Sequence, residues 1–387
     1  MDCRDSVSAM TPPVLALAMT FLLAWPLPSG AAEICPAGVA GTGTDCAAAS
    51  ELAESLSRAR VDRTLATDPL SDRSYRLNGG TAPPAGDVVP LFAMTADGDN
   101  TNFKTSLTQW GTALSVADQE AMKLLQNGLG EDLTLPKTVN RKPDFDIWAQ
   151  GRRELYVDNG TVQGTALTSY VGADYRWHND LLIGGMVQLD DSRRSLLASP
   201  AASEGAAFMA GPYMAYRITP NIKIDAKAAW GTAHDSAVTG ANGMSLDTNR
   251  LLTEAKLSGK WGWNAWQLSQ TGALTYVDET SAGVAGMPGN SIDVTRFTVR
   301  PELKRRIDTG YGASIEPFAF FKSSLDLSEA QSGAPLAQNT IGGGVTLAKP
   351  DNYKIRAVAD FTENNDGADQ VATGKVLVTV PSRLLGF

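Results

Sequence analysis

The sequence predicts an all-β protein: an antiparallel transmembrane β-barrel of about 12 strands, preceded by a signal peptide and a short, partly helical N-terminal region. Two observations predict this fold. Polar and apolar residues alternate along many segments after residue 143, and the connections between these segments alternate between short and long. The stretch 221–231 illustrates the alternation. Because successive side chains of a strand point to opposite sides, one face of it is apolar and ends in an aromatic residue: Ile222, Ile224, Ala226, Ala228 and Trp230.

The opposite face of these segments carries charges of both signs, which predicts a water-filled or salt-bridged lumen inside a lipid-facing wall. A half-buried strand of a soluble protein also alternates, so the argument depends on the number of long strands and not on any one of them. About 12 strands follow residue 145, and an even number lets one chain close with antiparallel neighbours. The predicted pore-lining residues are Asp174, Arg176, Lys223, Asp225, Lys227, Glu254, Lys256, Arg296, Arg300, Glu302, Lys354 and Arg356.

The connections give the second argument. The short ones contain Gly, Pro, Asn or Asp, which supply turn geometry, at 177–180, 219–221, 263–265, 308–310 and 349–352. Looser stretches lie between them, at 190–204, 234–247, 279–291, 324–338 and 364–371. Short periplasmic turns and longer outer loops are typical of bacterial outer-membrane barrels.

Residues 1–32 are predicted to be a secretory signal peptide. An apolar run at 13–27 is followed by the small residues Ser29, Gly30, Ala31 and Ala32, which suit cleavage. A membrane anchor is the alternative, but this run is shorter than the roughly 20 residues that a spanning helix needs. With a barrel downstream, the expected location is the outer membrane of a Gram-negative bacterium, with loops at the cell surface and outer-membrane lipid around the wall.

Two cysteines, Cys35 and Cys46, remain after the signal peptide. In an oxidising periplasm we expect them to form one disulfide across a small loop. A metal or redox pair is the weaker alternative, because no His or further Cys lies nearby and the spacing fits no common metal site.

Residues 33–142 form the upstream region, with helices expected at 47–60 and 115–127 and a loop at 81–90. The second helix has Ser115 as a possible N-cap and Gly128 as its stop. This region could lie in the barrel lumen or pack as a small domain outside it, and the sequence leaves both possibilities open.

Residues 143–387 resemble the autotransporter β-domain, the outer-membrane translocator barrel of type V secretion. The similar segments are 145–152, 170–176, 182–188, 210–213, 222–231 and 298–302, and their order and spacing carry the resemblance more than any one motif does. The resemblance implies a twelve-stranded translocator with an N-terminal segment threaded through its pore. It also implies a terminal aromatic residue, here Phe387, that the barrel-assembly machinery reads as an insertion signal. Pro381 and Arg383 depart from the usual alternating tail.

Another departure concerns the passenger, the exported part of an autotransporter. Barely 110 residues separate the signal peptide from the barrel, and they contain no repeats. The family's self-cleaving members cut beside an Asn-Asn pair in the pore segment, but Asn140 is followed by Arg141, so self-cleavage is not expected.

The expected function is therefore a translocator that exports or anchors a short N-terminal region at the cell surface. A channel, or a structural or adhesive barrel without a true passenger, is the alternative. We expect no enzyme, no cofactor and no metal: His178 falls in a turn and His234 begins a loop beside Asp235. The run 342–344, Gly-Gly-Gly, is read as strand bending or close packing and not as a phosphate loop. The net charge of −9 argues against nucleic acid, and a monomer is expected.

Overall fold

The structure is a computed structural model of the chain. It describes residues 43–70, 73–77, 93–97, 100–107, 144–158, 162–196, 201–239, 242–281, 291–310, 312–328, 337–349, 353–364 and 370–379. Cys35, Phe387 and the predicted helix 115–127 lie outside these residues, so the disulfide and the insertion signal stay predictions. Cys46 lies in the first helix.

One α-helix, α2 (Gly43–Ala66), precedes the strands and is followed by a 3₁₀ turn, η1 (Arg73–Leu77). The helix runs beyond both ends of the predicted 47–60. Its sequence is rich in alanine, and Glu54 pairs with Arg58 one turn later at 3.0 Å, a spacing that supports an exposed helix surface. None of the helices in the described residues combines the length and the apolar character that crossing a membrane requires.

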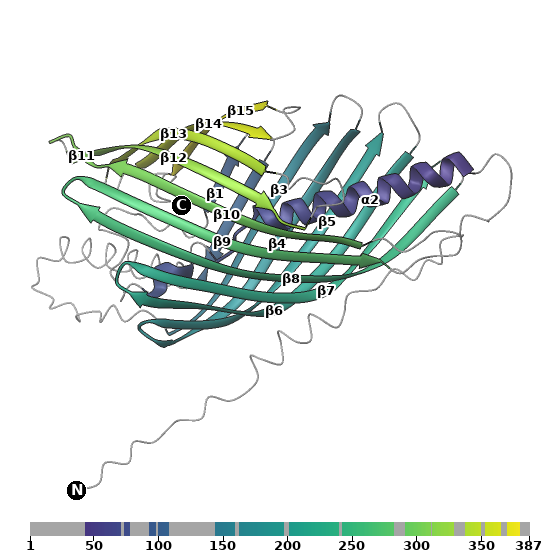
Figure 1. Ribbon diagram of the computed structural model, residues 1–387, viewed down its shortest axis with the longest axis horizontal. Helices are drawn as coiled ribbons and strands as arrows, with labels where there is room; N and C mark the ends of the chain where they lie inside the picture. The colour runs from purple at the N-terminus through teal and green to yellow at the C-terminus, as the bar shows by residue number, and fades with distance from the viewer. Residues whose placement is uncertain are drawn as a thin grey trace, which may run out of the picture. The chain divides into compact units, whose positions relative to one another are not determined.

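The described strands form one antiparallel sheet. Their bounds are β1 (Ala93–Asp97), β2 (Asn100–Ser106), β3 (Phe145–Asp158), β4 (Val162–His178), β5 (Leu181–Leu196), β6 (Ala201–Thr219), β7 (Ile222–Thr239), β8 (Asn242–Trp263), β9 (Trp266–Ser281), β10 (Ser291–Arg305), β11 (Ile307–Asp308), β12 (Ser314–Asp326), β13 (Ala337–Lys349), β14 (Tyr353–Asn364) and β15 (Gln370–Thr379). Figure 1 shows their arrangement around α2.

The order of strands in this sheet follows the order of the chain. Each strand from β1 to β10 pairs with the next, β10 pairs with β12, and the pairing then continues through β13 and β14 to β15. The two-residue β11 lies off this path and pairs with β12. β1 lies beside β15, so the two ends of the path meet. Twelve long strands begin at Phe145, which confirms the predicted antiparallel barrel. The β1–β2 hairpin, which pairs with β3 through β2, was not predicted.

The outer face of the sheet carries a belt of exposed apolar side chains. On β8 this belt extends from Leu251 to Trp261, which is ten residues apart. At about 3.3 Å per residue and a tilt of about 40°, ten residues span about 25 Å, the height of an outer-membrane barrel's apolar band. Further exposed members of the belt are Phe145, Val171, Tyr175, Trp177, Phe208, Tyr216, Trp230, Trp263, Trp266, Phe297, Phe321, Ile341 and Phe361.

The connections sort into two ends of the barrel. We call the end with the turns 179–180, 220–221 and 264–265 the turn rim, and the opposite end the loop rim. Two of the predicted loops at the loop rim were wrong: most of 190–204 and 234–247 is strand, and the strands continue to Leu196 and Thr239. β7 and β8 therefore extend beyond the aromatic end of the belt, where most described residues of their outer faces are polar, among them Thr232, His234 and Ser236.

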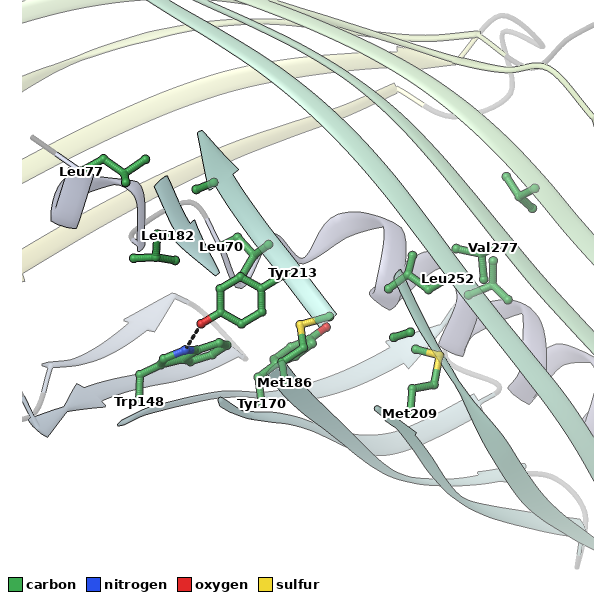
Figure 2. Close-up of a cluster of buried hydrophobic side chains, with 14 of the residues drawn as sticks. Leu70, Leu77, Trp148, Tyr170, Leu182, Met186, Met209, Tyr213, Leu252 and Val277 are labelled. Carbon is green, nitrogen blue, oxygen red and sulfur yellow. Dashed lines mark hydrogen bonds between the residues drawn. The ribbon is translucent and has the colours of Figure 1, made fainter. Parts of the chain in front are cut away.

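Hydrophobic residues fill part of the interior, as Figure 2 shows. Trp148 and Tyr213 meet edge to face at 6.1 Å between ring centroids, and the Trp148 indole donates a hydrogen bond of 2.7 Å to the Tyr213 hydroxyl. Val61, Leu70 and Leu77, from α2 and the residues after it, belong to the same buried cluster. The helix and the turn are thus packed into the barrel and not merely adjacent to it.

Candidate functional site

The candidate functional site is the lumen, together with the segment 52–77 that occupies it. α2 packs against β5 to β10, and Leu56 and Arg60 are fully buried there. Its opposite side carries a polar stripe at helical spacing, in which the Glu54, Arg58 and Asp62 side chains are 42%, 53% and 69% exposed. One face of the helix is therefore docked and the other faces water.

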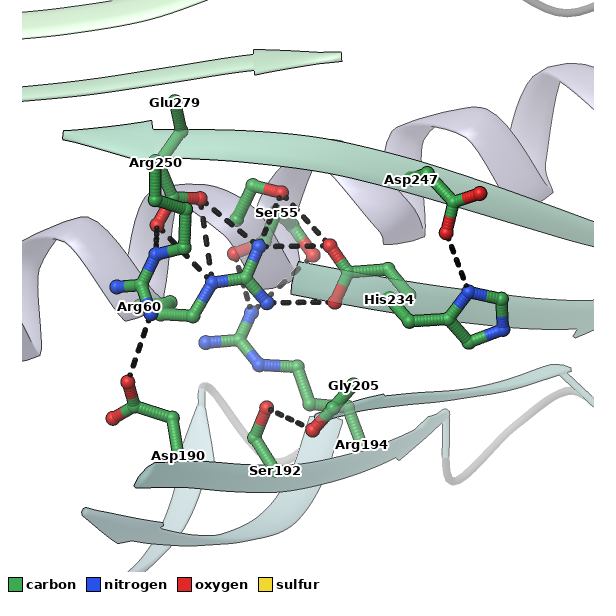
Figure 3. A network of polar contacts seen from close by, with 12 residues as sticks. Ser55, Arg60, Asp190, Ser192, Arg194, Gly205, His234, Asp247, Arg250 and Glu279 are labelled. Atoms are coloured by element: carbon green, nitrogen blue, oxygen red, sulfur yellow. Dashed lines mark hydrogen bonds and ion pairs between the residues drawn. The ribbon is translucent and has the colours of Figure 1, made fainter. Parts of the chain in front are cut away.

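Arg60 is the centre of the most buried ionic network (Figure 3). Its Nη1 donates to Asp235 Oδ1 at 2.6 Å and its Nη2 donates to Glu279 Oε2 at 2.9 Å, with all three side chains fully buried. Arg250 donates to Glu279 at 2.6 Å and to Asp190 at 3.0 Å. The helix thus places one cation among three carboxylates of the wall and the guanidinium of Arg250, while Arg194 of β5 donates to Ser55 of the helix at 3.1 Å.

The charge state of Arg60 follows from these contacts. Burial alone lowers the pKa of Arg60, but the hydrogen bonds and charges of Asp235 and Glu279 outweigh burial, so the pKa is raised and the side chain stays charged. Removing one member of such a network leaves uncompensated buried charge, which is strongly destabilising.

Close approach of the helix to the wall depends on Gly205 in β6. A Cβ atom at this position would lie 2.2 Å from Asp235 Oδ1 and 2.8 Å from Leu56 Cδ2. Ser57 donates to Asp235 Oδ2 at 3.2 Å, so the helix contacts this carboxylate from two successive turns. Any side chain at 205 would separate the helix from its partners.

A second ionic cluster holds η1. Arg73 donates to Asp146 at 2.5 Å and to Asp174 at 2.7 Å, and its guanidinium lies 5.4 Å from the Trp148 ring. Arg76 also pairs with Asp174, and it donates to the backbone oxygen of Asp144 at 3.1 Å. Asp174 further accepts a 2.8 Å hydrogen bond from Tyr213.

Between these clusters, Asp68 accepts a 2.5 Å hydrogen bond from Lys256. Burial alone raises the pKa of Asp68, but the positive charges of Lys256 and Lys227 outweigh it and hold the pKa below its usual range. Lys256 also lies 3.5 Å from Asp225, and Lys227 pairs with Glu254 at 3.1 Å. The segment is therefore held by charge at three levels of the lumen.

The structure places the predicted lining residues in three groups. Asp174, Asp225, Lys227, Glu254 and Lys256 meet the 52–77 segment or lie beside it, and Lys223 lies 3.8 Å from Asp225. Arg176 pairs with Asp144 at the turn rim, and Arg296 pairs with Asp326 at 2.5 Å and lies 3.8 Å from Asp62. Arg300, Glu302 and Arg356 lie together on the wall of β10 and β14. The backbone of Lys354 lies in β14, but its side chain is not among the described parts of the structure.

Sequence reasoning missed the residues at the centre of the network: Arg60, Arg73, Arg76, Asp146, Asp190, Asp235, Arg250 and Glu279. Asp190 and Asp235 had been assigned to loops. The residues that follow them do not alternate: 191–195 is polar throughout and 236–239 reads Ser-Ala-Val-Thr, so no period of two residues marked these stretches as strand.

The imidazole of His234 contacts Asp247 on the paired strand and not its neighbour in sequence, Asp235. Its Nδ1 lies 2.7 Å from Asp247 Oδ1 and its Nε2 lies 3.2 Å from Ser245 Oγ, on paired strands beyond the apolar belt. The order Ser–His–Asp is that of a hydrolytic relay. However, across the described residues 231–239 and 242–250 the backbone of both strands is paired in the ladder, and no pair of free N–H donors for an oxyanion stands out among them. Across the described residues, no group of three or more His, Cys, Asp or Glu could hold a metal ion.

Comparison with solved structures gives matches to autotransporter β-domains. The β-domain of the Bordetella autotransporter BrkA matches with a TM-score of 0.44 and 12% identity, over 60% of this chain and 96% of that one. The translocator domain of NalP from Neisseria meningitidis matches at 0.38 and 14%, over 69% and 96%. The transport unit of AIDA-I from Escherichia coli matches at 0.40 and 13%, over 65% and 95%.

Monoaromatic hydrocarbon channels are among the matches as well. At these identities the likenesses concern the fold alone. No protein-family model matches the chain. No curated protein matches it either.

Proposed function

We propose that this protein is an outer-membrane barrel that resembles an autotransporter translocator and keeps its N-terminal segment in the pore as a latched plug. One observation carries the proposal: the cations of the segment meet buried carboxylates of the wall. Arg60 meets Asp235 and Glu279, and Arg73 meets Asp146 and Asp174. Such complementarity is expected of a segment that belongs in the pore, because each partner alone would be a buried unpaired charge.

The direction of the segment supports an N-terminal region at the cell surface. Leu52 and Ala53 pack near the loop rim, against Ala201 and Ala237, whereas Arg76 reaches Asp144 at the turn rim. Since longer connections and strand extensions face outward in outer-membrane barrels, the amino end of α2 is on the outside and η1 is on the periplasmic side.

The apolar belt supports contact with outer-membrane lipid, and a single chain supplies the whole wall, which supports a monomer. We further propose that the barrel-assembly machinery inserts it, as the resemblance implies. The alternative function, a channel or a structural barrel without a passenger, is favoured by the water-exposed stripe of Glu54, Arg58 and Asp62.

An accessibility experiment tests the proposal. One epitope is inserted after Val39, before α2, and matched epitopes are inserted in the turn 220–221 and in the connection 282–290. On intact cells, antibody should reach the first and third epitopes and miss the second, which should become reachable only after the outer membrane is opened.

Either of two results would contradict the proposal. If the Val39 epitope behaves like the one in the turn, the segment does not reach the surface. If all three epitopes are equally accessible, or the protein is absent from the outer-membrane fraction, the barrel is not oriented or located as proposed.

A further inference from the structure

The Gly-Gly-Gly run of β13 has a specific role in the lumen wall. Phe320 pairs across the ladder with Gly342, and Phe318 pairs with Gly344. A Cβ atom would lie 2.4 Å from Phe320 Cζ at Gly342 and 2.8 Å from Phe318 Cζ at Gly344. The two rings therefore lie over the strand in space that only glycine leaves open.

Each of these rings carries an arginine. The guanidinium of Arg300 lies 4.5 Å from the centre of the Phe320 ring, and that of Arg356 lies 4.1 Å from the centre of the Phe318 ring. Glu302 lies between them, 2.9 Å from Arg300 and 3.7 Å from Arg356. Two guanidinium groups thus share one carboxylate, which leaves an excess of positive charge and of N–H donors.

The face of β10 that carries this group also approaches the exposed side of α2. Arg300 and Glu302 alternate on β10 with the exposed Leu303 and share the face of Arg296, which approaches Asp62 of α2. The Arg300 and Arg356 side chains are 39% and 34% exposed, although they line the interior. The helix docks on β5 to β10 and presents its polar stripe to the remaining space.

We propose that a water-filled passage remains beside the plug and that Arg300 and Arg356 form its anion-binding site, for small solutes that carry a carboxylate or a phosphate. Stacking on an aromatic ring holds the plane of a guanidinium and leaves its N–H edge free to bind such a group in a bidentate manner. This inference rests on one part of the proposed function, namely that the barrel spans a membrane.

Ion selectivity of the full-length protein in planar bilayers tests the site. Under a potassium chloride gradient the wild type should prefer chloride, and inorganic phosphate should reduce the current. A charge about 4 Å from a passing ion changes its energy by about 1 kcal/mol in a water-like medium, or about fivefold. The double variant R300Q/R356Q removes two such charges and should therefore lose on the order of 30-fold in anion preference.

Two variants separate this site from general effects of charge. R193Q/R305Q removes two arginines from the outer face of the barrel and should leave selectivity unchanged. F318L/F320L keeps every charge but removes both rings, and it should weaken the phosphate block. If R300Q/R356Q conducts like the wild type, or shifts no more than R193Q/R305Q, the site is refuted.

A variant that lacks residues 43–66 distinguishes failure of this inference from failure of the proposed function. If the wild type is silent and the deletion variant conducts, the passage is closed and the inference fails, while the plug stands. If both conduct equally, the plug proposal fails and the arginine variants still decide the anion site. If neither conducts, both proposals fail.

Discussion

At the residue scale, the plug depends most on Arg60. Replacing it with Gln leaves Asp235 and Glu279 buried with too little positive charge, and breaking a buried pair costs about 3–5 kcal/mol. R60Q should therefore raise the frequency of large openings in bilayers and make α2 sensitive to trypsin. R58Q is the matched control: its pair with Glu54 is exposed and is worth about 0–1 kcal/mol. Equal behaviour of the two variants would show that the network does not hold the helix.

Asp68 predicts a dependence of plug docking on pH. Its pKa is lowered in the folded protein, so its charge stabilises docking above the ordinary Asp pKa of about 3.9. This contribution is lost as the pH falls through the lowered value. Because trypsin is inactive at such acid pH, the measurement is the frequency of channel openings in planar bilayers. In the wild type this frequency should increase below about pH 4. D68N should show more openings at neutral pH and a weaker acid effect. An acid response as large in D68N as in the wild type would assign the effect to other groups.

The sequence could place single residues on a face but could not pair them. Alternation predicted that Asp174 and Lys256 line the pore, and in the structure both meet the 52–77 segment. Their partners Arg73 and Asp68 lie more than 100 residues earlier. A pattern with a period of two residues contains no information about such distant contacts, so the ionic clusters emerged only from the fold.

At the element scale, β7 contains both a lipid-facing stretch and an extension into water. Placing Arg at Ala226, inside the apolar belt, should destabilise the barrel by about 2–4 kcal/mol, whereas Arg at Thr232, on the same face but past Trp230, should cost about 0–1 kcal/mol. Unfolding by denaturant in lipid vesicles measures both variants. Similar losses at the two sites would mean that the belt does not mark the membrane.

The same elements show why the strand ends were mispredicted. Charged and small residues in 190–204 and 234–247 are typical of loops, yet most of these residues are strand. Beyond the membrane both faces of a strand meet water or a polar partner, so the contrast between the faces disappears. The alternation that identifies a membrane strand cannot mark where such a strand ends.

At the scale of the whole molecule, the antiparallel barrel could be predicted, but the β1–β2 hairpin that brings the two ends of the sheet together could not. The 12 long strands repeat one pattern, which makes the fold class readable from the sequence. The β1–β2 hairpin consists of strands of five and seven residues, too short for periodicity to stand out. The sequence also left open whether the upstream region lies in the lumen. The structure places its helix there because lumen carboxylates compensate its arginines.

The unequal height of the wall has a mechanical consequence. β8 has 22 residues and β15 has 10, so one side of the barrel stands above the lipid without a neighbouring layer outside it. Isolated hairpins in water are only marginally stable. Leu52 and Ala53 of α2 press against Ala201, Ala237 and Leu196 on the inner side of this raised part. The helix in the lumen therefore also supports this raised part of the wall from inside, and withdrawing it would loosen the strand ends that extend past the lipid.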